Sequence, residues 1–408
     1  MTLKRGIKRQ LIIAAILLLA TSCRSGNERD RTTRDRTTAD TALVKEAKNT
    51  MTIRYEQPFA NPQLNSYVDA PVKATGRLAW KAAFNPAGLP VGPQDLYVLD
   101  DRRALLDAGD VFFAIGLADR KALGFRKKSN NAFLVLGPGT QFYFADGYQL
   151  IRQDFEHYNE RAEDFFVPGL GQYSVLFSLF AGPETFIAGV QALGNPRVPT
   201  SSFELYEKLY RGTARRWSHG FDGMIVRPPI DGSGTAIVAR RDTVTVIDRQ
   251  GVRADIVMAH FQPISCSIGP DGLLYLVGTT GAKVLLCACT LKGEMRWEVP
   301  VAIPELLQPP IVDADGVVYL VASGSVTAFQ EGRRLWEYPL SSPSARASAF
   351  QDFRLIVADG ARVVCLDESG RAVWSYEDKD GESFVTAPVL DPAGRVLVAS
   401  GKSIVVIE

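Results

Sequence analysis

The chain has 408 residues, with 46 lysines and arginines against 45 aspartates and glutamates and a formal net charge of +1. A hydrophobic fraction of 46% with 22% charged residues is typical of globular proteins and excludes a wholly disordered, collagen-like or polytopic membrane chain. Near-neutral charge also excludes the basic surplus of a dedicated nucleic-acid-binding protein, and three histidines and five cysteines leave few residues for chemistry.

The N-terminal residues predict an export signal. The apolar run Leu11–Ala20 is too short to cross a bilayer of about 30 Å as a helix. Positive charges precede it and small residues follow it, which is the pattern of a secretory signal. The four charges are Lys4, Arg5, Lys8 and Arg9. We expect residues 1–22 to be a signal peptide, whose removal leaves 42 basic against 45 acidic residues.

The end of this signal resembles the lipobox of bacterial lipoproteins, in the sequence Leu19-Ala20-Thr21-Ser22-Cys23. It departs from the usual pattern because Ala20 stands at the third position before the cysteine. The resemblance implies that Cys23 is the lipid attachment site, with cleavage before it and acylation of the new amine. Each buried CH₂ group adds about 0.8 kcal/mol, so several acyl chains make a stable anchor. A conventional signal-peptidase site with Cys23 as a free thiol is the alternative.

Residues 23–70 are predicted to be the lipidated N-terminus and a flexible tether. The sequence Arg29–Thr33 is repeated at Arg34–Thr38, and mixed charge with Thr, Asn and Ser continues to Thr50. Such a composition buries too little apolar surface to fold. The tether would let the folded part stand off the membrane.

From residue 71 to residue 408 the chain repeats one unit. The unit is a proline-containing entry, an Asp/Gly turn, an apolar strand, a second turn, another strand and Gly-x-x-x-Trp, as in Pro310–Trp336. Trp297, Trp336 and Trp374 are spaced by 39 and 38 residues. A period near 40 with several short strands is typical of a β-propeller blade. The Asp/Gly turns suit tight hairpins, and one large tryptophan per blade would bury roughly 150–250 Å².

The segment Leu366–Trp374 resembles the tryptophan-docking repeat of quinoprotein-type propellers, which also occurs without quinone in bacterial envelope lipoproteins. The resemblance is good over residues 221–408 and weak over 85–220. In Ile247–Gly251 the turn is kept, but Asp255 stands where the tryptophan would be. The predicted docking residues are Gly76 and Trp80, Gly293 and Trp297, Gly332 and Trp336, and Gly370 and Trp374.

We predict an all-β fold, an eight-bladed β-propeller in which N- and C-terminal strands share one blade. The other seven blades are expected to begin near Leu96, Ala132, Val175, Ile225, Ile264, Ile311 and Phe350. The 338 residues from 71 to 408 then give about 42 per blade. Seven blades is the alternative, because Phe203–Tyr210 reads either as a helical turn or as an aromatic strand.

No pattern of catalytic or metal-binding residues is evident. His157, His219 and His260 are isolated, and we expect no metal at them. Asp313–Gly316 reads as a β-turn rather than a calcium loop. A disulfide from Cys266 to Cys287 or Cys289 is one alternative, but we expect buried thiols, with Cys365 unpaired. The adjacent cysteines of quinoprotein dehydrogenases are absent from the sequence, so we expect neither pyrroloquinoline quinone nor calcium.

The sequence therefore predicts a non-catalytic, lipid-anchored propeller that acts as a protein–protein interaction scaffold. It is similar in organisation to the propeller lipoprotein of the outer-membrane β-barrel assembly machine, which implies envelope proteins as partners and the periplasmic face of the outer membrane as location. The alternative is a quinone-dependent dehydrogenase or a carbohydrate- or small-ligand-binding propeller that uses the central funnel. An aromatic patch for partners is sought in residues 85–220, at Phe112, Phe113, Phe142, Tyr143, Phe144, Phe165 and Phe166.

Overall fold

The structure is a computed structural model of the whole chain. It describes residues 67–84, 95–108, 111–127, 135–136, 141–146, 149–154, 163–166, 174–181, 185–192, 200–209, 212–222, 229–231, 233–258 and 260–408. Within these ranges the regular structure consists of β-strands. In this part of the chain, no helix is long and apolar enough to cross a membrane.

The described strands form eight sheets, most of them antiparallel and four-stranded. The first three sheets comprise β3 (Asp95–Val98), β4 (Arg103–Ala108), β5 (Val111–Gly116) and β6 (Lys121–Lys127); β7 (Val135–Leu136), β8 (Gln141–Asp146), β9 (Gln149–Asp154) and β10 (Glu163–Phe166); and β11 (Ser174–Ala181), β12 (Thr185–Ala192), β13 (Thr200–Leu209) and β14 (Gly212–Asp222). The next three comprise β15 (Ala236–Arg240), β16 (Thr243–Ile247) and β17 (Arg253–Val257); β18 (Gln262–Ile268), β19 (Leu274–Thr280), β20 (Lys283–Cys289) and β21 (Met295–Val301); and β22 (Ile311–Val312), β23 (Val317–Ala322), β24 (Ser325–Gln330) and β25 (Arg333–Pro339).

The last two sheets combine strands from both ends of the described chain. One contains β1 (Tyr67–Val68), β26 (Arg346–Phe350), β27 (Arg354–Asp359), β28 (Arg362–Leu366) and β29 (Ala372–Glu377). The other contains β30 (Val389–Leu390), β31 (Val396–Ala399), β32 (Ser403–Ile407) and β2 (Leu78–Ala83).

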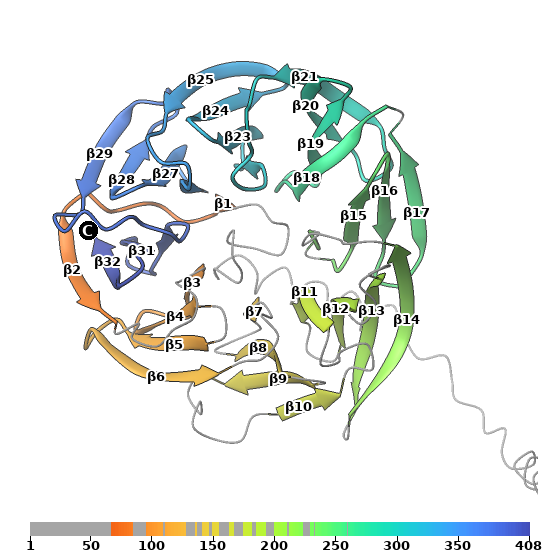
Figure 1. Cartoon of the computed structure of the whole chain (residues 1–408), viewed down its shortest axis with the longest axis horizontal. Helices are drawn as coiled ribbons and strands as arrows, with labels where there is room; N and C mark the ends of the chain where they lie inside the picture. Colours follow the sequence, from red (N-terminus) through yellow and green to blue (C-terminus); the bar gives the residue numbers. More distant parts are fainter. Residues whose placement is uncertain are drawn as a thin grey trace, which may run out of the picture. The chain divides into compact units, whose positions relative to one another are not determined.

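The sheets follow one another around a ring, with the first strand of each sheet toward the centre and the last strand outside (Figure 1). Buried side chains from neighbouring sheets share common cores, for example between the β18–β21 and β22–β25 sheets and between the β22–β25 and β26–β29 sheets. One further core joins the β26–β29, β30–β32 and β3–β6 sheets. The chain is therefore an all-β propeller, in which the described cores lie between neighbouring sheets.

In the sheets from β22 to β32 the second and third strands are largely apolar because they lie between two such cores. Strand β23 is buried along all six residues, and β28 is buried from its second residue onward. The outer strands instead alternate between exposed and partly buried residues, as in β25. This is the pattern expected where only one edge of the sheet meets solvent.

The predicted pairing of the two ends of the repeat region is present, since β2 pairs antiparallel with β32. Tyr67 and Val68, which the sequence placed in the tether, instead form β1 and pair in parallel with the end of β26. Between these two strands the chain crosses the last sheet, where Lys73 donates from its backbone N–H to the carbonyl of Gly394 at 3.0 Å.

The structure bears on two of the local expectations, and a third lies outside the described residues. Phe203–Tyr210 is no helical turn, because β13 runs from Thr200 to Leu209. The blade predicted to begin near Phe350 begins a few residues earlier, with β26, which ends at that residue. The expected start near Ile225 lies outside the described residues.

Candidate functional site

The tryptophans of the chain lie at one repeated position on the outer strands. Each pairs with the third strand of its sheet directly after a register shift, where the outer strand carries one extra residue. The pairs are Trp80 with Val406, Trp217 with Leu205, Trp297 with Ala288, Trp336 with Ala328 and Trp374 with Cys365. A β-bulge re-aims the following side chain and sharpens the local twist. Here it turns each indole toward the next sheet.

A residue with positive φ in the next sheet receives each indole. Gly370, with φ +76°, faces Trp336 so closely that an added Cβ would lie 2.6 Å from its Cδ2. The same arrangement places Gly332 against Trp297 and Gly76 against Trp374. We call these tryptophans and the residues that receive them the docking girdle. Only glycine combines the left-handed conformation with this close approach.

The girdle includes one tryptophan that sequence analysis missed. Trp217 lies against Gly251, where an added Cβ would be 2.6 Å from its Cγ, and its Nε1 donates to the carbonyl of Arg249 at 2.9 Å. Trp336 makes the equivalent bond to the carbonyl of Glu368 at 2.7 Å. Trp217 follows Gly212 by five residues rather than four, so the Gly-x-x-x-Trp pattern passed over it.

Two interfaces use other residues. The β16–β17 pairing has no register shift, and Asp255 lies opposite Thr245 rather than taking the tryptophan's role. Ile256 packs instead against Gly293, within 2.6 Å of an added Cβ. At the β2 to β6 interface Arg120, with φ +57°, places its guanidinium carbon 5.9 Å from the centre of the Trp80 ring. This is a cation–π contact where the other sheets have glycine.

The tight turns of the sheets use their carboxylates internally. Asp367 Oδ1 accepts hydrogen bonds from the backbone N–H groups of Ser369 and Arg371. The hydrogen bond from the Ser369 side chain is the largest of the contributions that lower the pKa of the Asp367 carboxyl. The Asp313–Gly316 loop is a turn of the same kind, as predicted. Its Asp313 is buried and accepts from Val317 N at 2.9 Å and from the Tyr319 hydroxyl at 2.8 Å.

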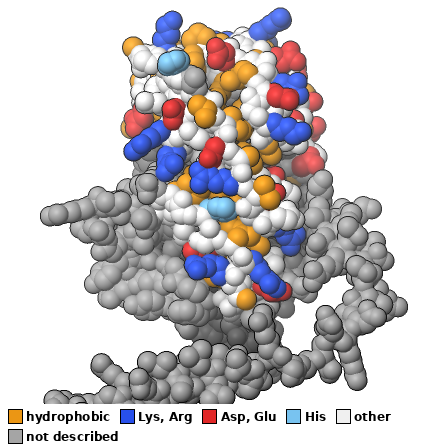
Figure 2. All heavy atoms as spheres, turned by 90° about the vertical axis from the view of Figure 1, so that its right-hand side faces the viewer, with side chains coloured by type: hydrophobic (Ala, Val, Ile, Leu, Met, Phe, Trp, Pro, Cys, Tyr) orange, Lys and Arg blue, Asp and Glu red, His pale blue; other side chains and the backbone are white. Residues whose placement is uncertain are grey.

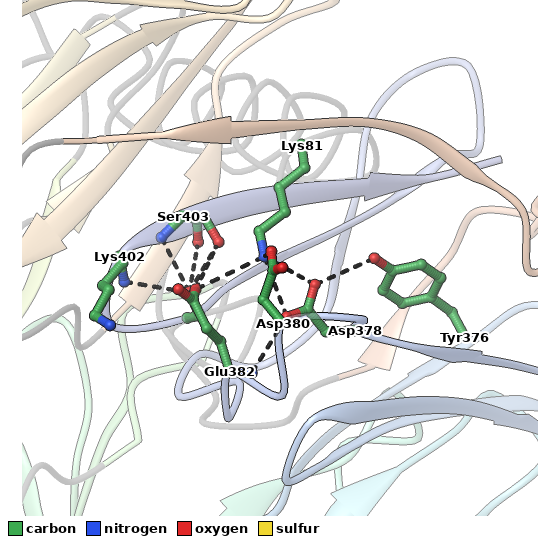
Figure 3. Close-up of polar contacts among 8 residues, drawn as sticks. Lys81, Tyr376, Asp378, Asp380, Glu382, Lys402 and Ser403 are labelled. Carbon is green, nitrogen blue, oxygen red and sulfur yellow. Dashed lines mark hydrogen bonds and ion pairs between the residues drawn. The ribbon is translucent and has the colours of Figure 1, made fainter.

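A polar cluster joins the two ends of the repeat region, on β2 and on the 378–382 loop (Figure 3). Lys81 Nζ lies 2.9 Å from Asp378 and 2.7 Å from Asp380. Glu382 accepts from the hydroxyls of Ser400 and Ser403 at 2.5 and 3.0 Å. We call this cluster the closing seam.

The electrostatics of the closing seam follow from its contacts. Burial works to lower the pKa of Lys81, but the hydrogen bonds that it donates to Asp380 and Asp378 outweigh burial and raise that pKa. Burial likewise works to raise the pKa of Asp378, while hydrogen bonds from Lys81 and the Glu382 backbone outweigh it and lower that pKa. Each group is thereby held in its charged form, so the seam acts as a fixed ion-pair network between chain ends.

The cysteines and histidines are placed as follows. Cys266, Cys287, Cys289 and Cys365 are buried free thiols, and burial raises the pKa of Cys266 and Cys365 to about 12. His219 Nε2 lies 2.8 Å from the carbonyl of Gly251. Over the described residues, no group of three His, Cys, Asp or Glu side chains is arranged to hold a metal ion. Cys23 and His157 lie outside those residues.

The aromatic residues singled out in the first half of the ring belong to its core. Phe112, Phe142 and Phe144 are buried and contact one another across two sheets. Phe113 and Tyr143 are also buried. The side chains of Phe165 and Phe166 lie outside the description. The described aromatics therefore hold the sheets together and form no exposed patch.

Comparison with known proteins gives one sequence match. Residues 214–408 match the PQQ-like family model described as outer membrane protein assembly factor BamB. No curated protein matches the chain in sequence. The repeats with the best-formed docking girdle lie within the matched segment.

Several solved structures also align with the chain. A streptogramin B lyase aligns at 10% identity over 81% of this chain and 97% of its own, with a TM-score of 0.46. Virginiamycin B lyase from Staphylococcus aureus aligns at 13% identity over 69% and 96%, with a TM-score of 0.44. Hsv2 from Kluyveromyces lactis aligns at 8% identity over 71% and 98%, with a TM-score of 0.49. From the family match and the repeated docking geometry, we conclude that residues 214–408 are PQQ-like repeats of the propeller.

Proposed function

We propose that this chain is a non-catalytic scaffold of the bacterial cell envelope, an eight-bladed propeller held at the membrane through Cys23. The observation that carries the proposal is the match of residues 214–408 to the model of an outer-membrane protein assembly factor. The predicted export signal, relaxed lipobox and tether support a location at a membrane of the cell envelope. We propose outer-membrane protein assembly as the process and envelope proteins as the partners.

The eight-blade count is supported by the grouping of the described strands into eight sheets. Each sheet is joined to the next through a shared core or an outer-strand contact. In a closed ring of this kind, the free sheet edges are those of the outer strands. The two ends of the ring and its outer face are therefore available for binding.

The lipid anchor is tested by growing cells with a clickable fatty acid. The chain should take up the label, and the Cys23→Ala variant should not. Equal labelling of both chains would place the acyl group elsewhere, and no labelling of either would remove the anchor from the proposal.

The non-catalytic role is tested against the quinone-dependent alternative. Pyrroloquinoline quinone with Ca²⁺ is added to the purified chain, and oxidation of alcohols and sugars is followed by dye reduction. We expect neither a change in quinone absorbance nor dye reduction above that of the heat-unfolded chain. Saturable oxidation by the folded chain would replace the scaffold with a dehydrogenase.

A further inference from the structure

Strand β1 lies inside the ring, on the side of its sheet that faces the centre. The order of this sheet is β1-β26-β27-β28-β29, with β29 outside, so β1 is added to the inner edge of β26 (Figure 1). The pairing is parallel, unlike that of β26 with β27. Paired parallel strands run in the same direction, so the chain passes from Tyr67 toward the end of β26 at Phe350. The N-terminal part of the chain therefore meets the ring at its centre and not at its circumference.

The inner edge of β26 is covered by groups of the same chain. The Gln308 side chain forms two hydrogen bonds with the backbone of Ala347, accepting from its N–H at 2.8 Å and donating to its carbonyl at 3.0 Å. Strand β1 covers the last two residues of β26, and the next backbone N–H, that of Gln351, donates to the carbonyl of Ala70 at 3.2 Å. A strand edge accepts an extended peptide readily. Here the chain supplies that peptide itself.

Strand β1 and the residues after it are fixed to the ring by packing. Val68, Ala70 and Val72 pack against the core that joins the last two sheets to the first. The backbone N–H of Lys73 then bonds to the turn of the last sheet, and Ala74 is buried. The point at which the N-terminal part of the chain reaches the centre of the ring is thus held in place.

The sequence just before β1 differs from the polar stretch further upstream. Between Arg24 and Thr50 there is no aromatic residue. Residues 51–66 instead contain Met51, Ile53, Tyr55, Phe59 and Leu64, and the first three alternate with polar residues. Alternation with a period of two is the pattern of a strand with one apolar face. We call residues 51–66 the entry segment, and its apolar side chains need a surface that covers them.

The outer face of the ring is a poorer place for the entry segment. Figure 2 views the ring from its side, over β14 and β17, and shows apolar side chains interspersed with Lys, Arg, Asp and Glu on this face. The outer strands β21 and β25 also carry Pro300 and Pro339, which have no N–H to donate to an added strand. At the centre, by contrast, the first strands β18, β22 and β30 each end their described sheet and turn a backbone edge inward (Figure 1).

We infer that the entry segment occupies the centre of the ring, as the chain's own extended peptide ligand, and that β1 is its last part. Sixteen residues reach about 53 Å when extended, whereas a strand of six residues such as β27 spans about 20 Å. The entry segment is therefore long enough to pass along the whole inner edge of a sheet. Its direct connection to β1 gives it an effective concentration on the order of millimolar, which a free ligand must exceed.

This inference does not depend on the proposed scaffold role. It concerns the central funnel, which a dehydrogenase or a small-ligand-binding propeller would use. If the entry segment fills the centre, partners are left with the two ends and the outer face of the ring.

Tryptic cleavage of the mature full chain, isolated from membranes in detergent, provides the first test. Lys48 lies in the polar stretch and Arg54 in the entry segment, so each reports on its own part of the chain. A synthetic peptide of residues 43–66 gives the intrinsic ratio of the two cleavage rates. Relative to that ratio, Arg54 in the chain should be cut at least about tenfold more slowly than Lys48. Equal relative rates at the two sites would overturn the inference.

Photo-crosslinking shows where the entry segment is held. A photoreactive amino acid replaces Phe59 in one full chain and Thr38, in the polar stretch, in a matched control. Cross-links from position 59 should join peptides of the same chain that contain the first strands β22, β26 or β30, and position 38 should give none of these. Cross-links from position 59 to outer strands, to a second copy or to another envelope protein would overturn the inference, as would the absence of any.

A pair of variants tests whether β1 holds the entry segment in place. Val68→Asp puts a charge on a half-buried side chain that packs against the core. Pro71→Asp, at an exposed position three residues further on, is the matched control. The first variant should speed cleavage at Arg54 by about fivefold or more and the second by less than about twofold. The pairing of β2 with β32 closes the ring in both variants. Unchanged protection of Arg54 in Val68→Asp would contradict the inference.

Discussion

At the scale of single residues, the docking girdle depends on the combination of positive φ and close approach. Gly370 and Gly272 have the same φ of +76°, but only Gly370 faces an indole, because nothing lies within 4 Å of a Cβ added to Gly272. The two positions therefore separate the cost of backbone strain from the cost of undocking a tryptophan.

We predict that Gly370→Ala lowers the free energy of unfolding by about 2–4 kcal/mol. Backbone strain supplies about 1–2 kcal/mol, and the clash with Trp336 adds an overpacking term of similar size. Gly272→Ala should cost only the strain. Urea denaturation of both variants measures the difference, and equal losses would show that the girdle does not stabilise the ring.

Trp217 offers a second test at this scale. Trp217→Ala should lower the free energy of unfolding by about 3–5 kcal/mol, because it removes a large side chain packed between two sheets. Trp217→Phe should cost less, since most of the packing is kept and the bond to the Arg249 carbonyl is lost. A Trp217→Ala chain that unfolds at the same denaturant concentration as the wild type would mean that this indole is not docked.

The residue scale also shows what the sequence could not reveal. Gly76 and Trp374 were each identified as girdle residues, but which glycine meets which tryptophan depends on the order of sheets in space. Trp217 was missed because its bulge is one residue further from the turn. Ile256 replaces a tryptophan only because β17 lacks the bulge, and no local pattern in the sequence indicates that absence.

At the scale of strands and sheets, the decisive contact is the one between β2 and β32. It brings together residues more than 300 positions apart, and the closing seam reinforces it with charge. The sequence predicted this pairing because an outer strand was missing from the last repeat and a lone Gly-x-x-x-Trp preceded the first. It gave no sign of the parallel pairing of β1 with β26, because two residues are too short for a recognisable pattern.

We predict that Lys81→Met lowers the free energy of unfolding at neutral pH by about 1–3 kcal/mol. The change leaves the buried Asp378 carboxylate without its ion-pair partner, and partial exposure of Lys81 moderates the loss. Lys402→Met is the control, since that residue contributes a backbone N–H to the seam. Urea denaturation of the two variants gives the comparison.

The Lys81→Met variant should also change how the stability of the chain depends on pH. The pKa of Asp378 is lower in the folded chain than its ordinary value of 3.8, so its contribution is present above that pH and is lost as the pH falls below it. The wild-type chain should therefore lose stability in acid more steeply than Lys81→Met does. Parallel acid profiles for the two chains would show that the ion pair contributes no stability.

At the scale of the whole molecule, the number of reactive thiols tests both the fold and the proposed lipid anchor. The chain has five cysteines, of which the structure describes four as buried and free. Burial raises the pKa of Cys289 to about 11 and that of Cys287 to about 12, so few thiolates exist near pH 8. We predict almost no reaction with a thiol reagent in the native state and four equivalents in denaturant. A fifth equivalent in denaturant would show that Cys23 is not acylated. Two equivalents instead of four would show that two of the thiols form a disulfide.

The general architecture was predictable because its signals repeat: the turn, the apolar strand and the tryptophan recur near every 40 residues over 221–408. Over 85–220 the turns are poorer, and there neither the strand ends nor the role of the aromatics could be predicted. Phe112 and Phe144 proved to be core, and four of the eight large apolar residues that are exposed in the described chain lie instead just before docking tryptophans. Exposure in a propeller depends on the neighbouring sheet, which local sequence does not contain.

The most direct test of the scaffold role is photo-crosslinking in the cells of origin. A photoreactive amino acid is placed at the exposed positions Arg102 and Arg216 of the first half of the ring, and at the exposed Leu335 on β25. Mass spectrometry of the captured material should identify a component of outer-membrane protein assembly at the first two positions, and Cys23→Ala should abolish its capture. Recovery of no envelope protein from any of these positions, with the chain folded and exported, would contradict the account.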